Sequence, residues 1–131
     1  MISHWMERTL AVGATVAVPL VLKFRPLPEV LAFCDRMPLV VRPRHTPQAL
    51  AWRVHRWLAH GRGPWTSSCL TRSLVLYAMM RQHGYDPRFA VGVAGSARQF
   101  AAHAWVMLGE GPVMDDADVE RTYTPLVSHG A

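Results

Sequence analysis

The 131-residue sequence is poor in lysine, cysteine and acidic residues, and each shortage excludes a class of protein. Lys23 is the only lysine, so arginine supplies 13 of the 14 basic side chains, against 9 acidic ones. Two cysteines, Cys34 and Cys69, are too few for a disulfide scaffold or a four-sulfur zinc site. Half of the residues are hydrophobic and 18% are charged, which excludes a disordered or fibrous chain.

The chain also lacks a cluster of positive charges. Residues 1–84 carry 11 basic and 3 acidic side chains, a net charge of +8, whereas residues 85–131 carry 3 basic and 6 acidic ones, a net charge of −3. A basic half could attract a nucleic acid, an anionic lipid or an acidic protein. Because no run of five or six cations occurs, we expect a solvated surface and no nucleic-acid partner.

No hydrophobic run is long enough to cross a bilayer. Residues 10–22 form an uncharged run of 13 residues, whereas a membrane-spanning helix needs about 20. A signal peptide would have a similar charged start and short apolar core. Residues 23–25 (Lys-Phe-Arg) follow the run in place of a small-residue cleavage site. We therefore expect a cytoplasmic protein in which this helix packs on the domain or on a partner, with a peripheral membrane contact as the alternative.

Five prolines divide residues 23–47 into short pieces, with one helix predicted from Pro28 to Arg36. We take this stretch as the joint between two parts of the chain. The prediction is an apolar and basic N-terminal appendage over residues 1–45 and a main domain over residues 46–131.

Two helices are predicted at the start of the main domain. Thr46 can cap the first helix, with Pro47 as its first residue. The second helix is predicted from Ser67 or Ser68 to His83, followed by Gly84 as a left-handed residue. The predicted apolar stripes are Leu50, Val54, Trp57 and Leu58 in the first helix, and Leu70, Leu74, Tyr77 and Ala78 in the second.

Beyond Gly84 the pattern changes from helical to extended. Apolar residues alternate over residues 89–93, which predicts a strand. Residues 100–108 predict a second strand, whose two apolar faces indicate a central position in a sheet. A turn over residues 109–112 leads to a third strand from Val113 onward. Helices followed by antiparallel strands make an α+β domain.

Cys69 stands at the predicted start of the second helix. Free N–H groups and the positive end of the helix dipole favour a thiolate there, which is the reactive form of cysteine. The alternative is a small buried apolar residue. We expect that alternative for Cys34, which has no histidine near it in the sequence.

His103 is the only polar side chain in the run from Ala101 to Val106. A buried imidazole has to satisfy both ring nitrogens, either with a backbone carbonyl or with a functional partner. If the following turn centres on Glu110, paired residues sum to about 219 or 220. The partner of His103 is then near residues 116–117, and Asp115 lies within a diagonal neighbour's reach.

A cysteine at a helix start, a histidine on a strand and an aspartate on the next strand make the Cys-His-Asp arrangement of covalent acyl chemistry. The histidine withdraws the thiol proton, the thiolate attacks a carbonyl carbon and an acyl-enzyme forms. Water then gives hydrolysis, and an amine gives transfer. This chemistry uses no cofactor, and no pair of side chains has the spacing of a metal site.

The motifs around these residues extend the pattern. They are CLTRSL at Cys69–Leu74, Gly84, Val91–Val93, FAAHAWV at Phe100–Val106 and Val113–Asp115. Over about residues 46–127 the sequence resembles the leader peptidases of lasso-peptide biosynthesis, which are transglutaminase-like, papain-related cysteine peptidases. The resemblance implies that Cys69 is the nucleophile, His103 the general base and acid, and Asp115 the orienting carboxylate.

The same resemblance implies partners. The substrate would be a precursor peptide made of leader and core, brought to the peptidase by a separate leader-recognition protein. An ATP-dependent macrocyclase would act on the product. Residues 1–45 would then dock the recognition protein, although they could equally serve only to cover the core.

Two positions depart from the family pattern or leave it open. Met107 stands where an acidic residue commonly follows the AHAWV strand. Asp116 competes with Asp115, because neighbouring strand residues point to opposite faces and only one can serve. The oxyanion hole would use the N–H of Cys69 and a second donor, for which Trp65 is a candidate alongside a packing role. Arg72 could reach an acidic group on a substrate or lie on the surface.

Two other functions fit the same residues. An acyltransferase or transglutaminase would use the triad with an amine as acceptor. A non-catalytic basic adaptor would bind a peptide or a nucleic acid, and its function would survive Cys69→Ala.

Overall fold

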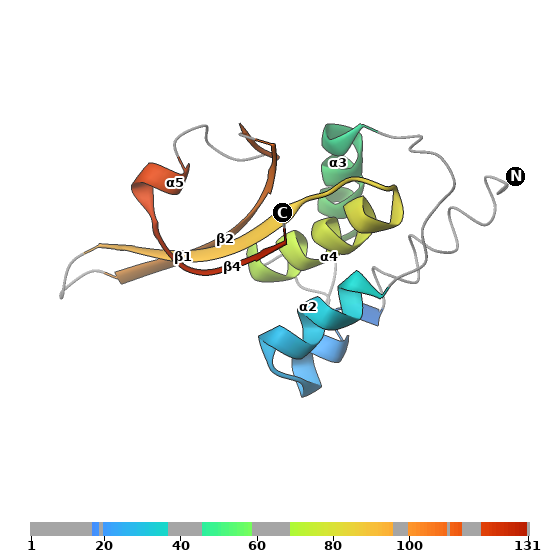
Figure 1. Ribbon diagram of the computed structural model, residues 1–131, viewed down its shortest axis with the longest axis horizontal. Helices are drawn as coiled ribbons and strands as arrows, with labels where there is room; N and C mark the ends of the chain where they lie inside the picture. Colours follow the sequence, from blue (N-terminus) through green and yellow to red (C-terminus); the bar gives the residue numbers. More distant parts are fainter. Residues whose placement is uncertain are drawn as a thin grey trace, which may run out of the picture.

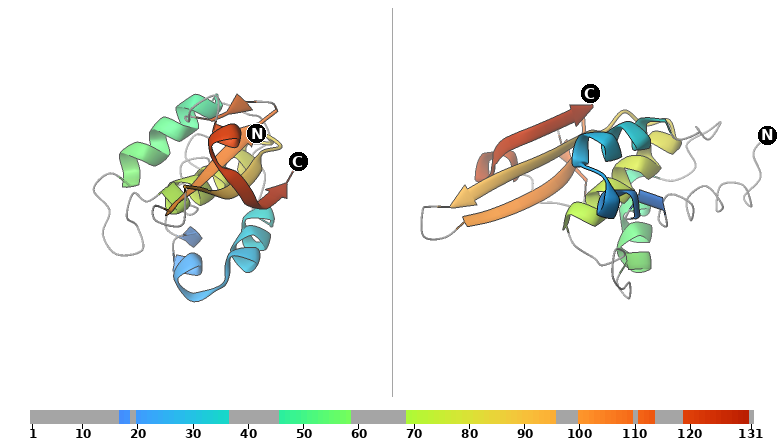
Figure 2. Two further views of the ribbon diagram at one scale, coloured as in Figure 1. Left: turned by 90° about the vertical axis from the view of Figure 1, so that its left-hand side faces the viewer. Right: turned by 90° about the horizontal axis from the view of Figure 1, so that it is seen from below.

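The computed structural model describes residues 17–18, 20–36, 46–58, 69–95, 100–109, 111–113 and 119–130. The helices are α2 (Leu27–Asp35), α3 (Pro47–Leu58), α4 (Cys69–Gln82) and α5 (Val119–Thr122), and the strands are β1 (Arg88–Gly95), β2 (Phe100–Leu108), β3 (Gly111–Pro112) and β4 (Thr124–Gly130). Helices α2–α4 lie together, and the β1–β2 hairpin extends away from them (Figures 1 and 2). The sheet order is β3-β2-β1-β4 with antiparallel pairs, which confirms the predicted α+β class.

Helix α4 forms the centre of the molecule. Every residue from Leu74 to Met80 is buried, because α2 and α3 cover two of its sides and β1 and β2 a third. A helix that is apolar all round belongs inside a core. The predicted stripe of α4 is therefore correct but too narrow.

The N-terminal residues share this core. Residues 17–18 and 20–24 are helical, and Val18, Val30, Leu31 and Cys34 lie in one buried cluster with side chains of α3 and α4. Helix α2 agrees with the helix predicted from Pro28 within one residue. In the described part of the chain, every helix is too short or too polar to cross a membrane.

Helix α3 begins as predicted. The side-chain oxygen of Thr46 accepts a hydrogen bond from the N–H of Ala49 at 3.1 Å, and its carbonyl accepts one from Leu50 at 3.0 Å. The expected stripe is wrong at Trp57, which is 38% exposed, while Ala51 is buried in its place. The buried face of α3 is centred on residues 50, 51, 54 and 58, and position 57 lies at its margin.

Gly84 ends α4 in the left-handed conformation that the sequence predicted, with φ of 80°. The N–H of Gly84 donates to the carbonyl of Arg81, and the N–H of Tyr85 donates to that of Met80. These two bonds make a Schellman motif, which satisfies carbonyl groups at the helix end.

Strands β1 and β2 pair from Arg88↔Met107 to Gly95↔Phe100. The third strand begins two residues earlier than predicted, since Met107 pairs with Pro112 and Leu108 with Gly111. Gly109 has φ of 64°, so the chain reverses within a shorter turn than the four residues expected. These pairs sum to 219, which confirms the predicted register at this end of β2.

The two faces of β2 carry different clusters. Ala104 and Val106 point into the core that contains α4, whereas Trp105 and Met107 pack with Val119 of α5 on the other face. This alternation is the ordinary period of a strand. It confirms the prediction that β2 is internal and covered on both faces over residues 104–107, although residues 101 and 102 are exposed.

Helix α5 and strand β4 were not predicted. Strand β4 pairs with β1 at the sheet edge, and the register shifts between Val91 and Gly92, which pair with Val127 and Pro125. The extra residue, Leu126, is 67% exposed. A short exposed strand with a bulge lacks the apolar alternation by which strands are recognised.

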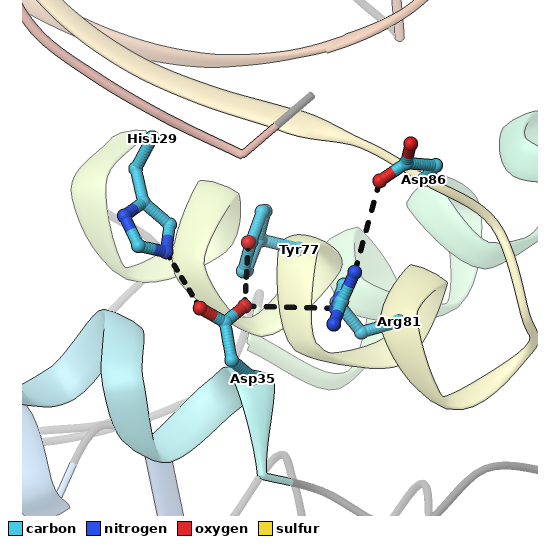
Figure 3. Close-up of polar contacts among 5 residues, drawn as sticks. All are labelled: Asp35, Tyr77, Arg81, Asp86 and His129. Carbon is cyan, nitrogen blue, oxygen red and sulfur yellow. Dashed lines mark hydrogen bonds and ion pairs between the residues drawn. The ribbon is translucent and has the colours of Figure 1, made fainter.

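A polar cluster fastens β4 to the helices. We call Asp35, Tyr77, Arg81, Asp86 and His129 the Asp35 cluster (Figure 3). The hydroxyl of Tyr77 donates to Oδ1 of Asp35 at 2.7 Å, and Nε2 of His129 lies 2.7 Å from Oδ2. Arg81 lies between two carboxylates, 3.6 Å from Asp35 and 3.7 Å from Asp86. The cluster therefore joins α2, α4 and the last strand.

Burial alone would raise the pKa of the Asp35 carboxyl group. The hydrogen bonds from Tyr77 and His129 and the charges of His129 and Arg81 outweigh burial, so this pKa lies below its ordinary value of 3.8. Burial, followed by the bond to Asp35, raises the pKa of Tyr77. Asp35 is therefore held as a carboxylate and Tyr77 as a neutral donor.

Candidate active site

Cys69 is the first residue of α4 and is partly exposed. It packs against the main core on one side and lines a cavity on the other. Cys34 is fully buried at the end of α2. Its burial, with the nearby charge of Asp35, raises the pKa of Cys34 to about 12. The two thiols therefore differ as the sequence predicted, since only Cys69 can meet a ligand and Cys34 stays protonated at neutral pH.

His103 lies in the middle of β2, opposite Gly92 of β1. Its ring stacks on Trp105 with centroids 5.9 Å apart, and it meets the ring of Tyr123 in a tilted arrangement with centroids 5.1 Å apart. The imidazole is half-buried. Two aromatic neighbours thus restrict its orientation while one side of the residue remains accessible.

Cys69 and His103 line the same cavity, which has a volume of about 250 Å³. The polar residues of its wall are Cys69, His103, Arg72, Ser73 and His55, and apolar residues of α3, α4 and β2 together with Val113 complete it. The four consecutive residues 103–106 of β2 all line the cavity. Because neighbouring residues of a strand point to opposite faces, the cavity runs along the strand and is not confined to one face of the sheet. Two of the residues that the sequence singled out, 34 positions apart, therefore line one cavity.

A buried hydrogen bond connects the segments that carry Cys69 and His103. The hydroxyl of Ser73, one helical turn after Cys69, donates to the carbonyl of Ala104 at 3.0 Å. Ala104 directly follows His103. This bond fixes the start of α4 against β2 at the wall of the cavity.

Gly92 makes room for the aromatic side of the site. A Cβ atom at this position would lie 2.8 Å from the ring of Trp105 and 2.8 Å from the carbonyl oxygen of Thr124. Real side chains do not approach so closely, so only glycine lets the indole lie across β1. The indole in turn supports the ring of His103.

Several predicted site residues lie outside the described residues. They include Asp115 and Asp116, the two candidates for the third member of a triad, as well as Trp65, Ser67 and Ser68. The hydrogen bond from the N–H of Val113 to the carbonyl of Val106 continues the register of the hairpin up to residue 113. The choice between the two aspartates stays a prediction.

Met107, where the family that the sequence resembles commonly has an acidic residue, is buried on the face of β2 that carries Trp105. An acidic side chain at that position would have to be removed from water among apolar neighbours. The methionine therefore fits its surroundings, and Met107 does not line the cavity.

Sequence reasoning missed several residues at the site. Trp52 and His55 of α3 line the cavity, and their rings meet edge to face with centroids 5.9 Å apart. Tyr123 belongs to no motif and was likewise not singled out, yet its ring contacts that of His103. The one available signal was that Trp52 is a large aromatic residue on the otherwise polar face of an amphipathic helix.

A thiol and an imidazole perform acyl chemistry when the two groups meet. Here both residues line one cavity, and the ring of His103 lies against Trp105 and Tyr123. The thiolate supplies a nucleophile, and the imidazole accepts and returns protons near neutral pH. The walls of the cavity keep part of the reacting group away from water, which strengthens polar interactions there.

Comparison with known proteins agrees with this chemistry. The family model of the transglutaminase-like superfamily matches residues 12–128, while no curated protein and no solved structure matches the chain. The superfamily includes cysteine peptidases and transglutaminases. The matched range contains Cys69 and His103 and also α2 and the helical residues before it. The chain therefore belongs to the transglutaminase-like superfamily.

Proposed function

We propose that the protein is a cysteine endopeptidase that removes the leader from a lasso-peptide precursor. The observation that supports this most is the shared cavity of Cys69 and His103 in a chain of the transglutaminase-like superfamily. The CLTRSL and AHAWV motifs support the narrower assignment. A cytoplasmic location, expected from the residues that follow the N-terminal apolar run, is part of the same proposal.

In the first half of the reaction, His103 takes the thiol proton and Sγ of Cys69 attacks the carbonyl carbon of the scissile peptide bond. The negative oxygen of the tetrahedral intermediate is bound by the N–H of Cys69 and a second donor. The C–N bond then breaks, and His103 gives its proton to the departing amine. A thioester of the leader remains on Cys69.

In the second half, His103 takes a proton from water, and the water oxygen attacks the thioester carbon. The C–S bond breaks, the leader leaves as a carboxylic acid, and Sγ regains the proton from His103. Asp115 would fix the tautomer and orientation of the imidazole in both halves. No cofactor enters either step.

A separate leader-recognition protein would deliver the precursor, and an ATP-dependent macrocyclase would use the new N-terminus. The genes beside this one provide a first test. We expect a short precursor, a small leader-binding protein and a cyclase that resembles asparagine synthetase. Neighbouring genes without any of these would contradict the lasso-peptide assignment but not the acyl chemistry.

The decisive experiment is cleavage of that precursor in the presence of the leader-binding protein, followed by mass spectrometry. We expect Cys69→Ala to lower the rate by at least about a thousandfold. The matched control, Cys34→Ala, removes the buried thiol and should cleave at nearly the normal rate. Normal cleavage by Cys69→Ala would overturn the proposal and favour a non-catalytic role.

Membership of the superfamily also favours a second candidate, an acyltransferase or transglutaminase. Here an amine, not water, would attack the thioester, and the product would be an amide. Adding a primary amine to the cleavage reaction separates the two, because the acid and the amide differ in mass. A peptidase gives mainly the acid at moderate amine concentration.

A further inference from the structure

The cavity next to Cys69 has one cationic side chain, Arg72, among its described lining residues. Arg72, His55 and His103 line it, and among its described lining residues none is acidic. This contrasts with the other end of α4, where Arg81 lies between two carboxylates. A ligand that brings its own negative charge would complement the cavity.

Arg72 is the strongest indication of such a ligand. It lies three residues after Cys69, so the two side chains leave the same side of α4, with Cβ atoms about 5–6 Å apart. Its Nε is buried and has no hydrogen-bond partner in the described part of the chain. Buried polar groups are normally paired, and a guanidinium forms its strongest bonds with a carboxylate or a phosphate.

Trp52 adds an apolar contact at the same cavity. It lines the cavity, yet 54% of the residue is exposed to solvent. Its edge-to-face contact with His55 holds the indole in place. Exposed, oriented tryptophan and arginine side chains are frequent anchors in peptide interfaces.

We propose that Arg72 and Trp52 form a substrate subsite that binds a carboxylate and a neighbouring apolar side chain of the peptide cleaved at Cys69. This inference rests on the proposed function, because it takes the ligand to be a peptide. The cavity of about 250 Å³ is smaller than the roughly 300–1,000 Å³ of sites that enclose a drug-sized ligand. It therefore accepts one or two side chains of a longer chain.

The subsite takes a carboxylate and not a phosphate. Phosphate sites surround the anion with several donors, such as clustered arginines or a row of backbone N–H groups. Among the described lining residues, one guanidinium stands beside mostly apolar side chains, and the buried Nε1 of Trp105 is the other donor without a hydrogen-bond partner. The planar guanidinium of one arginine can hold one carboxylate through two parallel hydrogen bonds.

The test measures binding to full-length Cys69→Ala protein, which cannot turn over its ligand. The probes are short synthetic peptides with amidated C-termini that carry one leucine and one nearby glutamate, each compared with its glutamine counterpart by fluorescence anisotropy. We expect the best glutamate peptide to bind about tenfold more tightly than its counterpart. A third peptide carries the glutamine and a free C-terminus. Its binding shows whether a terminal carboxylate can replace the glutamate side chain.

Variants assign the preference to the subsite. Arg72→Gln should abolish the difference between glutamate and glutamine peptides. Arg56→Gln, the matched control, removes an exposed arginine of α3 that does not line the cavity, and it should preserve the difference. Trp52→Ala should weaken binding of every leucine peptide about fivefold or more. Trp57→Ala, on the same helix but outside the cavity, should not.

Equal binding of glutamate and glutamine peptides by the parent protein would overturn the subsite. So would a preference that survives Arg72→Gln but disappears in Arg56→Gln, because it would reflect general surface charge. Circular dichroism identifies a variant that fails to fold, and Arg72→Lys then replaces Arg72→Gln. Lysine keeps the positive charge but cannot form two parallel hydrogen bonds with a carboxylate, so the preference for glutamate over glutamine peptides should fall without vanishing.

The outcomes separate this inference from the proposed function. Cleavage of a precursor with no dependence on an acidic side chain would remove the subsite and leave the peptidase. Charge-dependent binding to Cys69→Ala protein, with no cleavage of any precursor by the unmodified protein, would keep the subsite and remove the peptidase.

Discussion

The two ends of α4 carry similar polar side chains in contrasting surroundings. At the end of the helix Arg81 has two ion-pair partners and Tyr77 is bonded to Asp35. At its start the Nε of Arg72 has no partner within the described residues, and Cys69 opens to a cavity. The Nε of Arg81 makes no hydrogen bond either, but it lies 3.6 Å from the carboxylate of Asp35, so its charge is paired. A paired charge stabilises a fold, whereas an unpaired one next to a cavity can bind a ligand. The contrast predicts that substitutions at one end change activity and those at the other change stability.

The largest effect is expected at the cavity, for His103→Ala. In the proposed mechanism His103 removes the thiol proton and protonates the leaving amine, so kcat/KM should fall about a thousandfold or more without it. The free energy of unfolding should change by only about 1 kcal/mol, since the ring is half-buried. Cleavage kinetics and urea unfolding followed by tryptophan fluorescence measure the two quantities. A large loss of folding free energy together with the loss of kcat/KM would contradict the expected difference between the two ends of α4.

The opposite pattern is expected at the other end, for Asp35→Ala. The change leaves Tyr77, Arg81 and His129 without their shared acceptor, and it should lower the free energy of unfolding by about 2 kcal/mol. The rate of cleavage by the folded protein should not change. Asp86→Ala is the control, because that carboxylate is 75% exposed and a surface ion pair contributes about 0.5 kcal/mol or less.

Ser73→Ala tests whether the start of α4 is positioned by its bond to Ala104. Loss of this buried hydrogen bond should lower the free energy of unfolding by about 1 kcal/mol. A positioning role further predicts a severalfold lower kcat with an unchanged KM, since Cys69 would sit less well against His103. A purely structural role would lower stability and leave kcat of the folded protein alone.

The smallest effect concerns pH. The folded-state pKa of Asp35 is lowered from 3.8, so its carboxylate stabilises the fold above pH 3.8, and this contribution is lost as the pH falls through the folded-state value. Asp35→Asn keeps an acceptor but removes the charge, and we expect it to cost about 1 kcal/mol near neutral pH. Urea unfolding as a function of pH should show the two proteins converging in stability below pH 3.8. A difference that grows in acid would contradict the assignment.

Local features of the fold could be read from the sequence because neighbouring residues decide them. The cap at Thr46, the left-handed Gly84 and the bounds of β2 were predicted and are confirmed. The strand β4 was missed, because a bulge and an exposed edge remove the alternation of apolar residues. The bond between His129 and Asp35 spans 94 positions, and no local pattern indicates such a contact.

The site was predictable only for residues whose chemistry is unusual in their surroundings. Cys69 at a helix start and His103 in an apolar strand are conspicuous, and both line the cavity. Trp52 is less conspicuous: it stands on the polar face of α3, but an aromatic residue on a helix is ordinarily assigned to the core. Its exposure follows from how α3 is rotated against α4, and that rotation depends on packing between distant segments.

The protection of Cys34 has a practical consequence for chemical labelling. A thiol with a pKa of about 12 that is fully buried reacts slowly with electrophiles, because the thiolate is the attacking species. An alkylating reagent should therefore add a single mass increment to the native protein, at Cys69. Denaturant should then expose Cys34 and add a second increment, so that the number of adducts in one spectrum reports both unfolding and the accessibility of the Cys69 thiol.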